Sequence, residues 1–413
     1  MTTIDGFGPL PLIQPQTVSE IGDAIRRAAA EGQAVYPVGG QTALGIGLPP
    51  TRPGVAVDTR ALAGVIDYPA RDMTITVGAG ITLGRLQELL ARENQRLPVD
   101  VPDADRATLG GALAVNASGP RRLGFGTLRD YVIGISTSND EGKETKAGGR
   151  VVKNVAGYDL CKLHIGALGT LGIITQVTLK LRPLPEARAL ITLGCEDAAF
   201  EPLLEQIHHG RIRPACVEAV NRSAARALAV GTGGPLPDAP WVLLVGIEDN
   251  NDAVNCQVRQ FVREAPASVS SLEVRADTAG DALWRALMQF TAQPSAAASL
   301  KANLLPSAVA AFCLKAAAHS DELLLQAHAG SGIVRGHFPA PWPIERVHSV
   351  LQDLLAAATS GHGNLVLPHC PPAWKRTVPV WGARRNDAWL MKAVKDKLDP
   401  RYLFNPGRFA AGI

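Results

Sequence analysis

One stretch of the chain, residues 148–183, constrains the fold more than any other. It reads GGRVVKNVAGYDLCKLHIGALGTLGIITQVTLKLRP, and glycines recur at positions 166, 169 and 172. Glycine has no Cβ, so it adopts positive φ and lets other groups come close to the backbone. Residues 173–181 are β-branched or apolar and then alternate with polar ones, as in a half-buried strand. The pattern predicts a glycine turn that enters a strand; taken alone, a tight hairpin turn is its simplest interpretation.

Two more glycine loops precede this stretch. A predicted strand over 34–38 leads into Gly39-Gly40-Gln41-Thr42-Ala43, and such a loop can aim several backbone N–H groups at a phosphate. Thr108 is placed to cap a short helix whose first turn holds Gly110 and Gly111. Small residues dominate 107–119, which indicates either tight helix packing or a helix N-terminus whose free N–H groups meet an anion.

A third glycine pattern, at 78–84, does not make a dinucleotide site. Gly78 and Gly80 would require glycine at position 83 to complete G-x-G-x-x-G, but that position holds Leu83. The sequence therefore argues against a Rossmann site.

The length and charge of the chain limit its class. A chain of 413 residues predicts two or three domains, and a formal net charge of +3 disfavours nucleic acid as the main partner. The six cysteines form no Cys-x-x-Cys pair, which disfavours an iron–sulfur cluster or zinc knuckle and favours a reducing, cytoplasmic compartment. Residues 1–11 lack the pattern of a signal peptide, and no apolar run of about 18 residues predicts a membrane span.

The rest of the sequence contains two further parts with different secondary-structure patterns. Helix and strand patterns alternate over 184–380, which favours a second domain with an antiparallel sheet covered by helices. A predicted helix over 387–398, ended by Asp399-Pro400, then leads to Asn405-Pro406-Gly407.

Four motifs in order resemble the flavoprotein family of vanillyl-alcohol oxidase and p-cresol methylhydroxylase (PCMH). They are 37–42 (PVGGQT), Pro102 with 107–111 (ATLGG) and 116–119 (NASG), Lys153-Asn154 with 157–163 and 166–173, and 405–407 (NPG). The resemblance covers about 15–183 and 387–409. It implies an α+β fold with a two-subdomain PCMH-type FAD-binding domain at 1–183 and an α+β cap domain, with an antiparallel sheet, at 184–380. A C-terminal segment at 381–413 would return to the FAD domain.

The resemblance also implies non-covalent FAD, since loop 37–43 holds no His or Cys to attach it. The residues expected to bind the cofactor are Val38, Gly39, Gly40, Gln41, Thr42, Ala43, Pro102, Thr108, Gly110, Gly111, Asn116, Ser118, Gly119, Gly166, Gly169, Thr170, Gly172, Ile173, Ile174 and Asn405.

Within the family the chain is most similar to the smaller FAD-binding subunits of bacterial glycolate oxidases. This similarity implies a hetero-oligomer with a larger FAD subunit and an iron–sulfur subunit, which together oxidise glycolate to glyoxylate. A non-catalytic flavin subunit that relays electrons, or a stand-alone flavin oxidase, are the alternatives. Any contact with a membrane would be indirect.

Related 2-hydroxy-acid dehydrogenases carry a metal motif of the form His-x-Gly-Asp-Gly-Asn-x-His and a later Glu-His-Gly. The matching stretch here keeps His328 but has Ser331 and Arg335 at two ligand positions, and Gly361-His362-Gly363 lacks the Glu. One certain ligand is too few, so no metal is expected. His328 is the candidate to take the hydroxyl proton, and the candidates to hold a carboxylate are Arg335, Lys375, Arg376 and Arg384.

Overall fold

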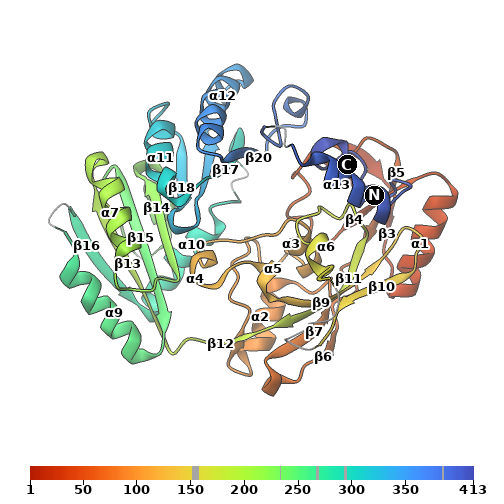
Figure 1. The fold of residues 1–413 in the computed structure, drawn as a ribbon, viewed down its shortest axis with the longest axis horizontal. Helices are drawn as coiled ribbons and strands as arrows, with labels where there is room; N and C mark the ends of the chain where they lie inside the picture. Colours follow the sequence, from red (N-terminus) through yellow and green to blue (C-terminus); the bar gives the residue numbers. More distant parts are fainter. Residues whose placement is uncertain (151–157, 233, 267–268, 293–294, 384–385) are drawn as a thin grey trace. The chain divides into compact units, whose positions relative to one another are not determined.

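A computed structural model describes residues 1–150, 158–232, 234–266, 269–292, 295–383 and 386–413. The chain forms two compact units: the first contains 1–118, 127–184 and 384–413, the second 119–126 and 185–383 (Figure 1). These limits differ from the expected ones by one residue at 184 and by three at 384. Residues 119–126, expected in the first domain, belong to the second unit.

The first unit begins with a small parallel sheet that presents the first glycine loop. Its strand order is β3-β5-β4, and an isolated parallel bridge between Val35 and Phe404 adds the C-terminal segment beside β4. Helix α1 packs on this sheet through Ile21 and Ile25, which are fully buried with Val35. A hairpin, β1 and β2, precedes it. The bounds are β1 Thr2–Ile4, β2 Phe7–Leu10, β3 Leu12–Ile13, α1 Val18–Ala30, β4 Ala34–Val38 and β5 Gly54–Asp58.

A local sequence signal, Thr17 followed three residues later by Glu20, marks the start of α1. Thr17 caps the helix by accepting a hydrogen bond from the backbone N–H of Glu20 at 3.2 Å. The Glu20 carboxylate returns to the N–H of Gln16 at 2.8 Å, one residue before the cap, so the capping box is shifted by one position.

The larger sheet of the first unit is antiparallel, in the order β10-β9-β11-β7-β6. The strand that follows the glycine turn, β11, therefore lies at its centre. The bounds are β6 Val65–Asp67, η1 Ala70–Asp72, β7 Thr74–Gly78, α2 Leu83–Ala91, β8 Gln95–Arg96, α3 Leu109–Ala114, α5 Leu128–Tyr131, β9 Val132–Ser138, β10 Glu144–Gly148, α6 Cys161–His164, β11 Ile173–Lys180, β12 Arg182–Pro183, α13 Ala388–Leu398 and η6 Ala410–Gly412.

The second unit is built on one eight-stranded antiparallel sheet, in the order β16-β13-β15-β14-β18-β19-β17-β20. Its strands are β13 Ala187–Cys195, β14 Cys216–Asn221, β15 Trp241–Asp249, β16 Ser271–Ala276, β17 Ala298–Asn303, β18 Leu324–His328, β19 Ile333–Phe338 and β20 Asn364–His369. Its helices are α4 Arg122–Phe125, α7 Asp197–His209, α8 Arg222–Ala229, α9 Asn251–Glu264, η2 Asp277–Gly280, α10 Asp281–Gln289, η3 Pro306–Ala308, α11 Val309–Ala317, η4 Ala329–Ser331, α12 Ile344–Ser360 and η5 Trp374–Arg376.

One face of this sheet is apolar at one end and polar further along. Helices α8 and α10 pack on it through a core that includes Cys216, Val220 and Trp284. Residues two apart on a strand share a face, so Glu218 points to the same side as Cys216 and Val220. A buried carboxylate at that position requires a partner.

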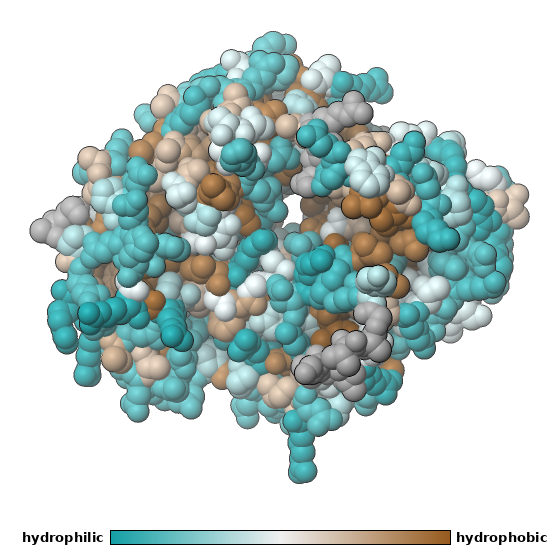
Figure 2. All heavy atoms as spheres, in the orientation of Figure 1, coloured by the Kyte–Doolittle hydropathy of each residue, from teal (hydrophilic) through white to brown (hydrophobic). Residues whose placement is uncertain are grey.

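No helix within the described part of the chain is both long and apolar enough to cross a membrane. On the face drawn in Figure 2, hydrophilic residues cover most of the surface and hydrophobic residues gather in separate patches.

Candidate functional site

The loop after β4 presents a row of unused backbone donors. The N–H groups of residues 39–43 donate to no residue that the structure describes. Gln41 has a φ of 59°, in the left-handed region, and left-handed residues occur in loops that turn successive N–H groups toward one anion. The loop therefore has the donor set for a phosphate or pyrophosphate group.

The two glycines of this loop are required by neighbouring protein rather than by a ligand. A Cβ on Gly39 would lie 2.2 Å from Thr108 Oγ1, and one on Gly40 would lie 1.8 Å from the Arg106 carbonyl oxygen. Both distances are far below contact, so any larger residue would push the two loops apart. Glycine at 39 and 40 thus holds the segment 106–108 against the donor loop.

The N-terminus of α3 is not an anion site, and that interpretation of the sequence was wrong. Thr108 does cap the helix, accepting from the N–H of Gly111 at 3.3 Å. The N–H groups of Leu109 and Gly110 donate to Ile81 O and Ala79 O, both at 2.8 Å. All three leading donors are therefore already satisfied within the protein.

The glycine turn at 166–172 closes against the C-terminal segment. Gly166, Gly169 and Gly172 have φ values of 84°, 66° and 142°, which explains why glycine occupies each position. The Asn405 side chain donates from Nδ2 to the Leu168 carbonyl at 2.6 Å. The predicted stretch 151–157, which includes Lys153 and Asn154, lies outside the described residues.

A pocket joins the donor loop, α3 and the C-terminal segment. The predicted cofactor residues that line it are Val38, Gly39, Gly40, Gln41, Thr42, Ala43, Thr108, Gly111 and Asn405. The predicted residues outside this lining are Pro102, Gly110, Asn116, Ser118, Gly119, Gly166, Gly169, Thr170, Gly172, Ile173 and Ile174. Lining residues that were not among those expected to bind the cofactor are Pro37, Leu44, Ile46, Ala114, Val115, Leu168 and Arg408, of which Pro37 and Leu168 lie within the motifs 37–42 and 166–173.

Several polar atoms around the pocket fit a polar cofactor. The side-chain oxygens Oδ1 of Asn116 and Asn405 are buried and accept no hydrogen bond within the described residues. Asn405 lines the pocket, whereas Asn116 lies outside its lining, so Asn405 Oδ1 and the donors at 39–43 provide an acceptor and an anion cradle, as a dinucleotide with a pyrophosphate and hydroxyl groups requires. The residues present therefore fit FAD, and none of the lining residues is His or Cys.

Arg408 holds in place residues 44–48, which directly follow the donor loop. Its guanidinium is buried and donates to the carbonyl oxygens of Leu44, Ile46 and Leu48. Burial lowers the pKa of Arg408, although the group stays charged. One residue of the C-terminal segment thus satisfies three carbonyls of a loop near the start of the chain.

The second unit contains a separate polar row on its sheet. His328 on β18 is 2% exposed, and its Nδ1 lies 2.8 Å from both carboxylate oxygens of Glu218, which is fully buried on β14. The His328 Nδ1–H therefore donates to Glu218, and Nε2 carries the lone pair. Arg335 on β19 donates from Nε to that Nε2 at 3.3 Å. Gln326 completes the row by donating from Nε2 to Glu218 at 2.6 Å.

Lys301 extends this row and was not predicted. It lies directly opposite Arg335 in the β17–β19 ladder. Burial is the main reason that the pKa of its ammonium falls to about 7, and the nearby Arg335 and Arg122 guanidinium groups lower it further. His337, also on β19, accepts from Ser299 at Nδ1 and donates from Nε2 to Phe290 O, so it is held by the protein. The row therefore combines two basic side chains, Arg335 and Lys301, with the imidazole of His328 and the carboxylate of Glu218.

Only two of the predicted catalytic residues lie in contact in the part of the chain that the structure describes. His328 and Arg335 are in contact. Arg376 is exposed on η5 and has no described contact with that pair, whereas Lys375 beside it is buried. Arg384 lies outside the described residues, and His362 is exposed after α12. Among the residues that the structure describes, no group of three or more His, Cys, Asp or Glu could hold a metal.

Comparison with known proteins agrees with these two units. The family model described as FAD binding domain matches residues 9–148, and the model described as FAD linked oxidases, C-terminal domain matches residues 184–409. The chain is 26% identical to glycolate oxidase subunit GlcD of Bacillus subtilis over 98% of its own length and 89% of that protein. It is also 26% identical to a D-lactate dehydrogenase of Archaeoglobus fulgidus, over 96% of this chain and 90% of that one.

A shorter match and a solved structure add detail. Glycolate oxidase subunit GlcE of Escherichia coli is 37% identical, but over only 37% of this chain and 43% of that protein. The fold is similar to that of 4-ethylphenol oxidase from Gulosibacter chungangensis, with a TM-score of 0.72 at 13% identity over 98% of this chain and 90% of that chain. The chain belongs to the FAD-linked oxidases and is an FAD-dependent oxidoreductase.

Proposed function

We propose that this chain is the FAD-binding subunit of a glycolate oxidase-type complex. It would oxidise glycolate or a similar small 2-hydroxy acid to the 2-oxo acid and pass the electrons to an iron–sulfur partner. The observation that supports this most directly is the polar row of the second unit, in which Glu218 and His328 are buried and Lys301 and Arg335 are half-buried. Lys301 and Arg335, which can hold a carboxylate, lie beside the imidazole of His328. Glu218 accepts a hydrogen bond from Nδ1 of that imidazole and so leaves the lone pair on Nε2.

Each residue of the row has a role in this proposal. Lys301 and Arg335 would bind the carboxylate of the acid, because both side chains are cationic donors on adjacent strands. His328 Nε2 would take the proton of the α-hydroxyl as the carbonyl forms. Glu218 would keep Nδ1 protonated and stabilise the imidazolium that results. FAD, when bound, supplies the acceptor for the hydride that leaves the α-carbon.

Non-covalent FAD is part of the proposal. The donors at 39–43 would bind the pyrophosphate, and Asn116 and Asn405 would accept from hydroxyl or amino groups of the cofactor. The pocket lining offers no His or Cys for a covalent bond. The likeness to glycolate oxidase subunits supports the partner chains, and the free cysteines of the described residues favour a cytoplasmic location; both belong to the same proposal.

A second candidate function is electron relay without chemistry on the acid. Arg335 donates a hydrogen bond to His328 Nε2 in the structure. An acid must break this hydrogen bond before His328 can accept a proton. The stretch that matches glycolate oxidase subunit GlcE has the higher identity, 37%, and that likeness supports an accessory subunit.

Anaerobic reduction of the purified chain by glycolate separates these candidates. Catalysis by this chain predicts loss of the visible flavin absorption when glycolate, D-lactate or D-2-hydroxyglutarate is added, and little loss in Glu218→Gln. Relay predicts an oxidised flavin with every acid until the partner subunits are added. Release of peroxide in air at the rate of flavin reduction would instead identify a stand-alone oxidase and contradict the role as a subunit.

A further inference from the structure

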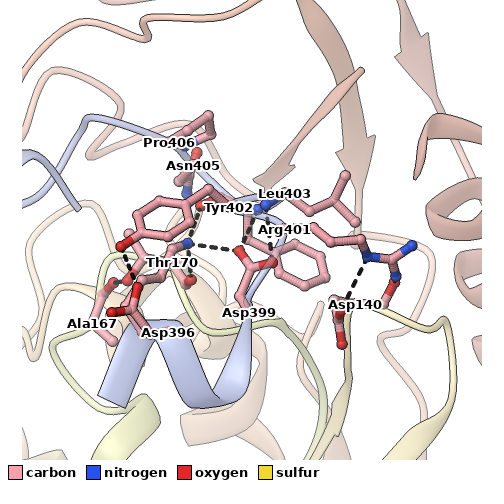
Figure 3. Close-up of polar contacts among 12 residues, drawn as sticks. Asp140, Ala167, Thr170, Asp396, Asp399, Arg401, Tyr402, Leu403, Asn405 and Pro406 are labelled. Atoms are coloured by element: carbon pink, nitrogen blue, oxygen red, sulfur yellow. Dashed lines mark hydrogen bonds and ion pairs between the residues drawn. The ribbon is translucent and has the colours of Figure 1, made fainter. Parts of the chain in front are cut away.

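The C-terminal helix α13 carries a lysine that no solvent reaches. The Lys395 side chain is fully buried, and its ammonium donates to three oxygens: Thr170 O at 2.6 Å, Asp399 Oδ2 at 2.7 Å and Phe404 O at 3.0 Å. An ammonium has three N–H groups, so each has one acceptor. The acceptors come from different segments: Thr170 belongs to the glycine turn, and Asp399 and Phe404 belong to the C-terminal segment (Figure 3 labels Thr170 and Asp399).

Asp399, the ion-pair partner of Lys395, also accepts hydrogen bonds from the backbone. Asp399 is fully buried, and its carboxylate accepts from the backbone N–H groups of Leu403 and Phe404, both at 2.9 Å. A buried ion pair is costly to desolvate and adds little net stability on its own. Its value here is that it fixes the path of residues 399–404 relative to the turn at 166–172.

Asn405 is the residue that this arrangement positions. Lys395 holds the carbonyl just before it and the turn that its Nδ2 contacts at Leu168. Asn405 and Leu168 both have positive φ, 43° and 51°; asparagine adopts this region readily, whereas a leucine stays there only when its surroundings hold it. The Asn405 side chain is 4% exposed and lines the pocket, and its Oδ1 accepts no hydrogen bond within the described residues.

We infer that Lys395 is a positioning residue for FAD. Its ammonium fixes the glycine turn and Asn405 together, so that Asn405 Oδ1 faces the pocket as an acceptor for a hydroxyl or amino group of the bound cofactor. The inference rests on the FAD site proposed above. It accounts for a fully buried lysine that neither the donor loop nor the polar row of the second unit uses.

The test is a double-mutant cycle on FAD affinity in the full-length chain. Flavin is removed, and FAD is titrated into wild type, Lys395→Met, Asn405→Ala and the double variant by calorimetry, well below each melting temperature. We expect each single variant to bind FAD about tenfold more weakly or worse, as for one lost hydrogen-bonded contact. The double variant should bind no more weakly than the weaker single variant, because both changes remove the same contact.

Two further variants keep the test decisive. Arg121→Met breaks a buried ion pair of the second unit, 2.7 Å from Glu248, and should lower the melting temperature without changing FAD affinity. If Lys395→Met does not fold because Asp399 is left unpaired, Lys395→Met/Asp399→Asn replaces it in the cycle. Losses that simply add in the double variant, or unchanged affinity in Lys395→Met, would overturn the inference and leave the FAD site standing. A wild-type chain that binds no FAD would refute the site itself.

Discussion

Replacing Lys301 with methionine should change how the stability of the second unit depends on pH. In the folded chain, burial and the nearby Arg335 and Arg122 lower the pKa of Lys301 from the usual 10.5 to about 7. Unfolding returns the side chain to water and restores the usual value. Between pH 7 and pH 10.5 the unfolded chain therefore binds a proton that the folded chain does not, and the free energy of unfolding rises with pH.

The size of the effect follows from that window. Each pH unit within it changes the free energy of unfolding by about 1.4 kcal/mol, so raising the pH from 7 to 9 should stabilise wild type by roughly 2 kcal/mol through Lys301. Methionine binds no proton, so Lys301→Met should lack this gain and be the more stable protein at pH 7. Buried thiols such as Cys195, whose pKa is raised to about 12 by burial, act in the opposite direction, but equally in both proteins.

Urea unfolding at pH 7 and pH 9, followed by tryptophan fluorescence, measures this difference. Five of the six tryptophans lie in the second unit and only Trp389 lies in the first, so the signal reports mainly the unit that contains Lys301. Lys315→Met, which removes an exposed lysine paired with Asp353, is the matched control and should keep the wild-type pH dependence. Equal pH dependence in wild type and Lys301→Met would refute the argument that Lys301 is buried among cations.

The other predictions concern the cofactor and the row. Gly39→Val should abolish flavin binding, because its side chain would collide with Thr108, whereas Gly64→Val, where a Cβ meets nothing within 4 Å, should purify with full flavin content. Acid precipitation should leave all flavin in the supernatant, and flavin in the pellet would contradict non-covalent binding. Dialysis against a chelator should leave the rate of flavin reduction by glycolate unchanged, since no described group of residues offers three metal ligands; a loss restored by zinc would show a metal site.

The glycine loops could be predicted from sequence because their signals are local. A strand followed by Gly39-Gly40, and glycines with positive φ at 166, 169 and 172, mark turns whatever the rest of the chain does. The interpretation of α3 failed because its leading N–H groups donate to Ala79 and Ile81, about thirty residues earlier, and no local pattern reports such a pairing.

The polar row could not be assembled from sequence because it depends on strand register. Glu218, His328, Arg335 and Lys301 come from four strands, and the pairings of β14 with β18 and of β17 with β19 bring them together. One signal was available: Glu218 and Lys301 are isolated charges within otherwise apolar strand patterns. A charge in such a place needs a partner across the sheet, although the sequence does not say which one.

The contact of Arg408 with loop 44–48 has a consequence for biosynthesis. Leu48, whose carbonyl accepts from Arg408, is synthesised 360 residues before Arg408. At translation speeds of about 5–20 residues per second, the loop would wait roughly 20 to 70 seconds for the arginine that satisfies its carbonyls. During that interval the whole second unit is synthesised. The nascent chain thus lacks a finished cofactor pocket until Arg408 has been made, so FAD would be captured after the second unit has been synthesised rather than serve as an early template for folding.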